Sequence, residues 1–87
     1  MTTPSSPPEA PALPVRHAAD LAAAVRARRH ALGLRQIDLA GLGNTGNRLI
    51  VDIEKGKPTT QLQKVLDVLD LLGLELVVQP RQTGGAR

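Results

Sequence analysis

A chain of 87 residues without cysteine, phenylalanine, tryptophan or tyrosine must fold around a small aliphatic core. It can form neither a disulfide nor a cysteine-ligated zinc site, and His17 and His30 have no ligand at metal-binding spacing, so we expect no metal or other cofactor. No apolar run reaches the roughly 20 residues that span a bilayer, and no signal-like apolar stretch opens the chain, so a cytoplasmic protein is expected.

The formal net charge is +3, and the positive charge is concentrated in one segment. Between positions 16 and 58, eight basic residues face four acidic ones, a local excess of +4, whereas three of each lie beyond position 58. A surface that faces nucleic-acid phosphates and an ordinary solvated surface explain this excess equally well. The eight basic residues are Arg16, Arg26, Arg28, Arg29, Arg35, Arg48, Lys55 and Lys57.

The two ends of the chain are not expected to join the core. Residues 1–15 hold five of the seven prolines, which predicts a disordered tail. This tail is either a passive leader or, less simply, a docking arm for a protein partner. Residues 81–87 are predicted to be a second disordered tail, which leaves residues 16–80 as the folded domain.

Helical periodicity begins after the proline-rich tail. The first helix is expected over residues 18–32, where several alanines raise helix propensity and Gly33 provides the end. Two shorter helices are expected over residues 36–42 and 47–55, with a Gly/Asn-rich turn between them.

These two short helices have helix-turn-helix spacing. Ala40 is small enough to lie under a crossing helix, and Asn44 tolerates the left-handed backbone that the turn needs. Ile50 and Ile53 are the apolar anchors of the second helix of the pair. Its other side is then free to enter a DNA groove.

A fourth helix is expected over residues 61–72, with Thr60 and Gln63 at capping-box spacing and Gly73 as its end. Val68 and Leu71 extend its apolar surface beyond one face, which suggests a contact with a second subunit. The predicted core stripe consists of Leu62, Val65, Leu66, Leu69 and Leu72.

After Gly73 the apolar period changes from helical to alternating, which predicts a β-strand ended by Pro80. A single strand is unstable in water, and nothing else in the chain can pair with it. We therefore expect a homodimer in which two copies of the strand pair across a two-fold axis. The strand residues expected at this dimer contact are Leu74, Leu76, Val77 and Val78.

The outward side of the third helix carries the candidate DNA contacts. With the two isoleucines inside, Asn47 could bind adenine, and Arg48 could bind guanine or a phosphate. Asp52 either accepts from a cytosine amine or orients a neighbouring arginine, and a structural role is equally open. Gln36 begins the second helix, where its amide and free backbone N–H groups could hold a phosphate. The flanking residues of the same surface are Arg35 and Thr45.

Arg29 and Glu54 suggest a structural role instead. Arg29 lies near the end of the first helix, and Glu54 follows the anchor Ile53, so a partly buried ion pair could join the first helix to the third.

Residues from about Leu21 to Val78 resemble the Xre/Cro family of helix-turn-helix regulators and, within it, the HipB-type antitoxins. The resemblance lies in the segments RARRHALGLRQIDLA, NRLIVDIEKGKPT and LQKVLDVLDLLGLELVV. It implies a mainly helical, four- to five-helix, lambda-repressor-like domain with a C-terminal β-strand that pairs across a homodimer. Positions that match the family's DNA contacts are Gln36, Thr45, Gly46, Asn47, Arg48 and Asp52.

The same resemblance implies a function. A protein of this kind binds an inverted-repeat operator in double-stranded DNA, represses its own operon and binds a HipA-like serine/threonine kinase toxin, in the cytoplasm of a bacterium and on the nucleoid when bound. The chain departs from the family pattern at three positions, where Asn44 replaces a turn glycine, Thr45 replaces an apolar residue and Leu49 replaces a larger side chain.

Two other functions remain open from the residues. The chain could be a protein-binding module that neutralises a toxin, or a phage-type repressor without a toxin partner. An enzyme is not expected, because the sequence has no nucleophile with a base, no glycine-rich phosphate loop after a strand and no paired carboxylates on an apolar cleft.

Overall fold

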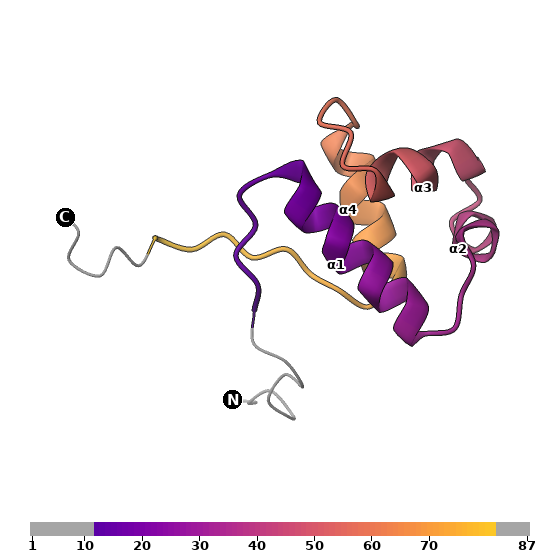
Figure 1. Cartoon of the computed structure of the whole chain (residues 1–87), viewed down its shortest axis with the longest axis horizontal. Coiled ribbons are helices and arrows are strands. Elements are labelled where there is room, and N and C mark those ends of the chain that lie inside the picture. The colour runs from indigo at the N-terminus through magenta and orange to yellow at the C-terminus, as the bar shows by residue number, and fades with distance from the viewer. Residues whose placement is uncertain (1–11, 82–87) are drawn as a thin grey trace.

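The computed structural model describes residues 12–81, and these form four helices (Figure 1). They are α1 (Ala18–Ala31), α2 (Gln36–Leu42), α3 (Asn47–Glu54) and α4 (Leu62–Leu71). Each helix end lies within one residue of its predicted position, and the mainly helical fold is confirmed. None of these helices is long and apolar enough to cross a membrane.

Acidic side chains in the first turn cap the N-termini of α1 and α2. The Asp20 carboxylate accepts the backbone N–H of His17 at 3.1 Å, and the Asp38 carboxylate accepts that of Arg35 at 2.8 Å. Each bond satisfies a donor at the helix N-terminus and places negative charge where the helix dipole favours it.

The capping box predicted for α4 is wrong. The helix begins one residue later than expected, and Thr60 lies in the preceding turn, where its hydroxyl donates to the carbonyl of Lys57 at 3.1 Å. Gln63 is directed along the helix instead, since its amide donates to Asp67 at 2.9 Å. A turn that folds back on residue 57 therefore takes the threonine away from the cap position.

Two arginines of α1 donate hydrogen bonds to carbonyl groups at the C-termini of α3 and α4. The Arg26 guanidinium donates to the carbonyl of Glu54, the last residue of α3, and the Nε of Arg28 donates to the carbonyl of Leu72 at 2.8 Å, just after α4. Cations at helix C-termini satisfy free carbonyl groups and interact favourably with the helix dipole. Part of the basic charge counted in the sequence is therefore used inside the fold.

The core lies where α3 packs against α1 and α2 and where α4 covers α2. Its buried aliphatic side chains are Val25, Leu39, Ala40, Ile50, Ile53, Val65, Val68, Leu69 and Leu72. Val25, Leu39 and Ile50 are fully buried, and Ala40 and Ile53 are 3% and 4% exposed, so the small residue and the two apolar anchors predicted for the helix-turn-helix face the core.

The buried face of α4 differs from the predicted stripe. Val68, which seemed surplus, is 2% exposed, whereas Leu62 in the first turn is 63% exposed. Leu66 is only half-buried, and Leu71 remains partly exposed. Burial at 65, 68, 69 and 72 is also a helical pattern, and only contact with the other helices selects it over the alternative face.

Two positive-φ residues set the connections around α3. Asn44 has φ of 51° in the turn between α2 and α3, so this turn forms with asparagine in the left-handed conformation, as the sequence predicted. Gly56 has φ of 75° after α3, and a Cβ there would lie 3.2 Å from the Cα of Ala19. This glycine lets the end of α3 approach the start of α1.

The segment after α4 is extended and forms no strand within the described residues. Leu74 is half-buried and its N–H donates to the carbonyl of Leu69 at 2.8 Å, but exposure rises to 40% at Leu76, 59% at Val77 and 94% at Val78. In Figure 1 this segment extends away from the four helices. The predicted tails, 1–15 and 81–87, lie mostly outside the described residues.

Candidate nucleic-acid interface

Helix α3 has a buried side and an outward side, and the outward side holds the predicted base contacts. Ile50 and Ile53 are 0% and 4% exposed, and they anchor the helix against α1 and α2. Asn47 and Arg48 are exposed, and Asp52 is half-buried at the edge. The α2–turn–α3 unit therefore presents the N-terminal half of α3 to solvent.

A buried ion pair joins α1 to α3. The Nε of Arg29 lies 2.7 Å from Oε2 of Glu54, and its Nη2 lies 2.9 Å from Oε1, in a two-pronged arrangement. Both side chains are almost fully buried, and the remaining Nη1 donates to the carbonyl of Leu34 at 2.8 Å. The pair fixes α3 relative to α1 with its main hydrogen-bonding groups satisfied.

Gln36 belongs to this buried network rather than only to the surface. Its Nε2 donates to Oε1 of Glu54 at 3.1 Å, and the side chain is half-buried. One amide N–H is thereby used within the fold, and the second has no acceptor among the residues that the structure describes. The contact links the first residue of α2 to the last residue of α3.

The network also sets the ionisation of Glu54. Burial alone would raise the pKa of this carboxyl, but hydrogen bonds from Arg29 and Gln36, with the charges of Arg29 and Arg26, outweigh burial and hold the pKa below its ordinary value. The hydrogen bond to Glu54 in turn raises the pKa of Arg29. Both members of the pair are therefore charged at neutral pH.

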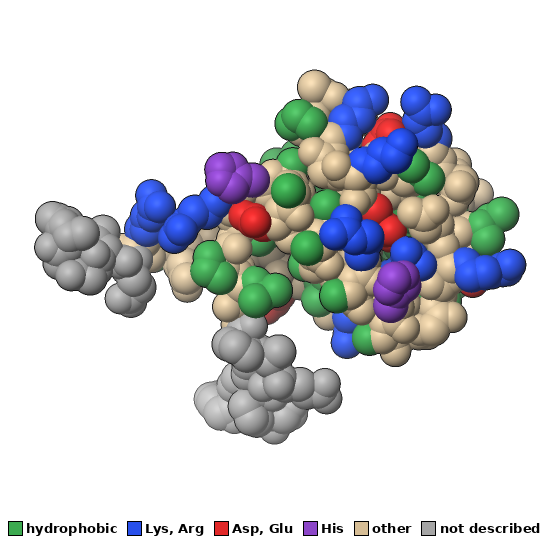
Figure 2. All heavy atoms as spheres, in the orientation of Figure 1, with side chains coloured by type: hydrophobic (Ala, Val, Ile, Leu, Met, Phe, Trp, Pro, Cys, Tyr) green, Lys and Arg blue, Asp and Glu red, His purple; other side chains and the backbone are tan. Residues whose placement is uncertain are grey.

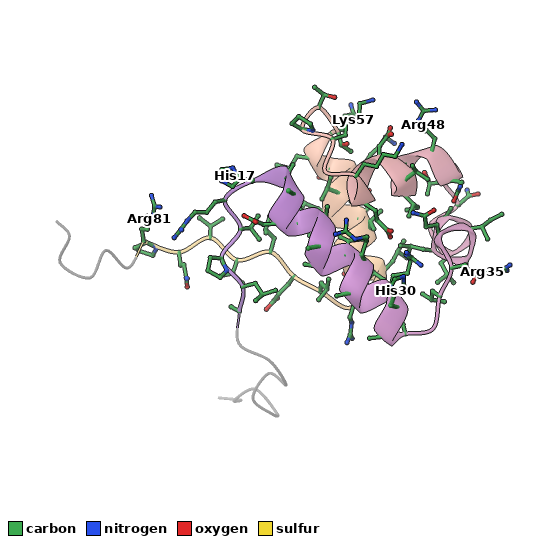
Figure 3. The ribbon with its side chains drawn as sticks, viewed as in Figure 1. His17, His30, Arg35, Arg48, Lys57 and Arg81 are labelled. Carbon is green, nitrogen blue, oxygen red and sulfur yellow. The ribbon has the colours of Figure 1, made fainter. Side chains whose placement is uncertain are left out.

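A second cluster lies on the outward side of α3. The Nε of Arg48 is 3.2 Å from Oδ1 of Asp52, one helical turn away, and the Nζ of Lys57 is 3.6 Å from Oδ2. The backbone N–H of Lys57 also donates to the carbonyl of Asp52 at 3.0 Å. Figure 3 shows Arg48 and Lys57 along the same edge of the molecule.

Lys57 is a candidate contact that the sequence analysis did not assign. It was counted in the charge balance, but helical periodicity could not place a residue beyond the end of α3. The turn at Gly56 brings it back beside Asp52. The sequence feature that could have identified Lys57 is its position directly after Gly56, the glycine that ends the third helix.

The other predicted contacts lie at the starts of α2 and α3. Arg35 precedes α2, with its exposed side chain 2.9 Å from Asp38, and Figure 3 shows it at the end of the molecule away from His17 and Arg81. Thr45 is half-buried in the turn, and its N–H donates to the carbonyl of Ala40 at 3.0 Å. Gly46 is the exposed N-cap of α3 and leads directly into the exposed Asn47.

The fold uses part of the positive charge counted between positions 16 and 58, so less of it is available at the surface than the local excess of +4 suggested. Arg29 is buried and paired with Glu54, and Arg26 and Arg28 each use one side-chain donor on a carbonyl group inside the fold, so part of this charge is directed inward. In Figure 2, Lys and Arg side chains gather along the edge formed by α3 and the turn that follows it. Part of the exposed positive charge therefore lies along α3 and the turn after it, while other Lys and Arg side chains are spread over the rest of this face.

We expect the free energy of unfolding to decrease as the pH is lowered from about 4 to about 2. Hydrogen bonds from the Arg35 side chain and backbone lower the pKa of Asp38 to about 2, from 3.8. A lowered pKa in the folded state stabilises the fold above the unfolded-state value, and this contribution is lost as pH falls through the folded-state value. Urea midpoints measured across this range should decline.

The control for this acid effect is Asp38→Asn, which should be less stable than the wild type at pH 7 and should show a weaker decline. Glu54, whose pKa is also lowered, should account for much of the decline that remains. Equal slopes for both proteins would contradict a role for Asp38.

Comparisons with known proteins agree with this arrangement. No protein-family model matches the sequence. The chain is 48% identical over 62 residues to an uncharacterized HTH-type transcriptional regulator, y4mF, of Sinorhizobium fredii (strain NBRC 101917 / NGR234), a match that covers 71% of this chain and 82% of the relative.

Two solved structures of HipB share the fold. A HipB variant in complex with an O2 20mer matches with a TM-score of 0.76 and covers 83% of this chain and 100% of its own. HipB in complex with an O4 20mer matches with a TM-score of 0.74, over 80% and 99%. Both are 21% identical in sequence, so they show the fold. From its sequence relative, the chain belongs to the HTH-type transcriptional regulators, and its fold is that of HipB, as the resemblance predicted.

Proposed function

We propose that this chain is a sequence-specific DNA-binding repressor that acts as a homodimer on an inverted-repeat operator. The observation that carries the proposal is the orientation of α3: its isoleucines are buried, while Asn47 and Arg48 are exposed at its N-terminal half. Membership of the HTH-type regulators supports it, as do the HipB complexes with O2 and O4 20mers. We assign the protein no catalytic activity and place it in the bacterial cytoplasm, on the nucleoid when bound.

Each part of the surface has a role in this proposal. Asn47 and Arg48 read base edges in the major groove, since an Asn amide can donate to adenine N7 and accept from N6, and an Arg guanidinium can donate to guanine O6 and N7. The hydroxyl of Thr45 and the N–H groups of Gly46 and the first turn of α3, together with Arg35 and the second amide N–H of Gln36, position the protein on phosphates. Lys57 adds a phosphate contact at the other end of α3.

The dimer forms through the residues after α4. Leu76, Val77 and Val78 are exposed in the single chain, and their alternating pattern suits a strand. Two copies pair across a two-fold axis, satisfying the backbone groups that one strand leaves free. The two α3 helices then reach half-sites one duplex turn apart.

We further propose that this repressor is the antitoxin of a HipBA-type module, which represses its own operon and binds a HipA-like kinase toxin. Support comes from the sequence resemblance and the shared HipB fold. A kinase-like reading frame beside the gene, whose product co-purifies with this chain after co-expression, is the expected finding. A phage-repressor gene context without such a frame would contradict it.

The DNA-binding proposal is tested with duplexes selected by the full chain from a random-sequence pool. The selected duplex should be an inverted repeat, and its affinity should fall by orders of magnitude between about 50 and 200 mM salt, because phosphate contacts release counterions. Arg48→Ala should weaken binding by about 1–3 kcal/mol without unfolding the domain. Mobility shifts and far-UV circular dichroism measure the two effects.

The matched control is Arg81→Ala, which removes an arginine at the far end of the molecule from Arg48 (Figure 3). It should keep its affinity for the selected duplex. Failure to enrich any sequence would contradict specific recognition, and an unchanged shift for Arg48→Ala would remove this residue from base reading.

A further inference from the structure

Asp52 is an acidic residue in a surface proposed to face an anionic polymer. Its side chain is 21% exposed and lies beside Arg48, a proposed base reader. A bare carboxylate at this place would repel phosphates, so its position needs a physical reason. That reason lies in the two cations that it holds.

The contact with Arg48 restrains this side chain without using all of its donors. The Nε of Arg48 donates to Oδ1 of Asp52 at 3.2 Å, one turn along the same helix, while the arginine side chain remains 83% exposed. Its Nη1 and Nη2 groups make no hydrogen bond to another described residue, and together they have the fork geometry that suits guanine O6 and N7. Asp52 thus restrains the arginine side chain at Nε and leaves its terminal Nη groups exposed.

The contact with Lys57 is built into the main chain. The backbone N–H of Lys57 donates to the carbonyl of Asp52 at 3.0 Å, which holds the turn after α3 close to the helix. The ammonium group then lies 3.6 Å from the second carboxylate oxygen, Oδ2. Each oxygen of Asp52 therefore faces a different cation, one on the helix and one on the turn.

We propose that Asp52 is a positioning residue that sets the specificity of DNA recognition, an inference that rests on the proposed DNA-binding function. It orients Arg48 toward a base edge, and it neutralises part of the charge that Lys57 would otherwise offer to any phosphate. Specific binding depends on the orientation of the fork, whereas non-specific binding depends on the number of phosphates neutralised. Removing the carboxylate should therefore change the two kinds of binding in opposite directions.

The test compares two duplexes at one salt concentration: the selected duplex and the same base composition in scrambled order. Asp52→Asn should tighten binding to the scrambled duplex, steepen its salt dependence by about one unit of log–log slope, and lower the ratio of the two affinities about tenfold. Asp52→Glu, which keeps a carboxylate one turn from Arg48, should retain part of the ratio. Thermal unfolding of each variant checks that the domain is folded.

Two further variants separate positioning from charge. Asp67→Asn removes the same charge from the exposed surface of α4, and it should keep the wild-type ratio. Lys57→Gln combined with Asp52→Asn should abolish the tightening on scrambled DNA, since the released lysine is its source. A ratio that stays lowered in this double variant assigns the loss of specificity to Arg48.

An unchanged ratio in Asp52→Asn would overturn the inference. A loss confined to duplexes carrying one particular cytosine would also overturn it, because Asp52 would then be a direct base contact. Failure of the proposed function has a different signature, in which the wild type itself binds both duplexes equally.

Discussion

Arg29→Ala is expected to lower the free energy of unfolding by about 3–5 kcal/mol, a large part of the stability of a small domain. The substitution leaves the Glu54 carboxylate buried, with Gln36 as its remaining side-chain donor, and it also frees the carbonyl of Leu34. The uncompensated charge, more than the lost attraction, accounts for the size of the effect. Urea unfolding followed by far-UV circular dichroism measures it.

Two variants define what the buried ion pair contributes. Arg29→Leu together with Glu54→Leu should be less destabilised than Arg29→Ala, because no charge is left unpaired in the core. Arg35→Ala breaks the exposed pair with Asp38 and should lower the urea midpoint much less than Arg29→Ala does, because solvent screens an exposed pair. If Arg29→Ala behaved like Arg35→Ala, the pair would have to be solvated, contrary to the burial of both side chains.

Leu76→Asp combined with Val78→Asp is expected to convert the dimer to monomers and to weaken operator binding by about 10²–10⁴-fold. Both residues lie in the exposed segment after α4, on one side of the proposed strand. Like charges placed together across a two-fold axis repel, and a single α3 can engage only one half-site. Sedimentation equilibrium at micromolar concentration and mobility shifts measure the two losses.

The matched control places the same two charges, at the same spacing, in the other extended segment, as Leu13→Asp with Val15→Asp. These residues are also exposed and apolar, but they precede α1. This variant should remain dimeric and should bind the operator. Monomers in the wild type, or equal dissociation of both double variants, would contradict pairing through the C-terminal segment.

Two acidic residues of α3 explain how one short helix serves both the fold and the proposed recognition. Asp52 and Glu54 are two positions apart, so they point to widely different sides of the helix. Glu54 is buried against Arg29, whereas Asp52 lies outside between Arg48 and Lys57. The first holds α3 in place, and in our proposal the second governs what the helix reads.

Local sequence patterns predicted the helices and the turn between α2 and α3 because their causes are local. Helical periodicity, the positive-φ glycines that follow three of the helices, and the tolerance of Asn44 for positive φ act within a few residues of one another. The stripe of α4 failed because two overlapping helical patterns fit its apolar residues. Contact with the other helices buried Val68 and left Leu62 exposed.

The sequence by itself determined the four helices, the outward side of α3 and the two partners of the buried ion pair, since spacing and residue type carry that information. The tertiary structure alone decided which cations are used internally, because Arg26 and Arg28 of α1 meet the ends of α3 and α4 across long stretches of chain. It also decided that Gln36 bonds Glu54 and that Lys57 returns to Asp52. Those contacts depend on how helices cross and on where a turn redirects the backbone, and no local period encodes either.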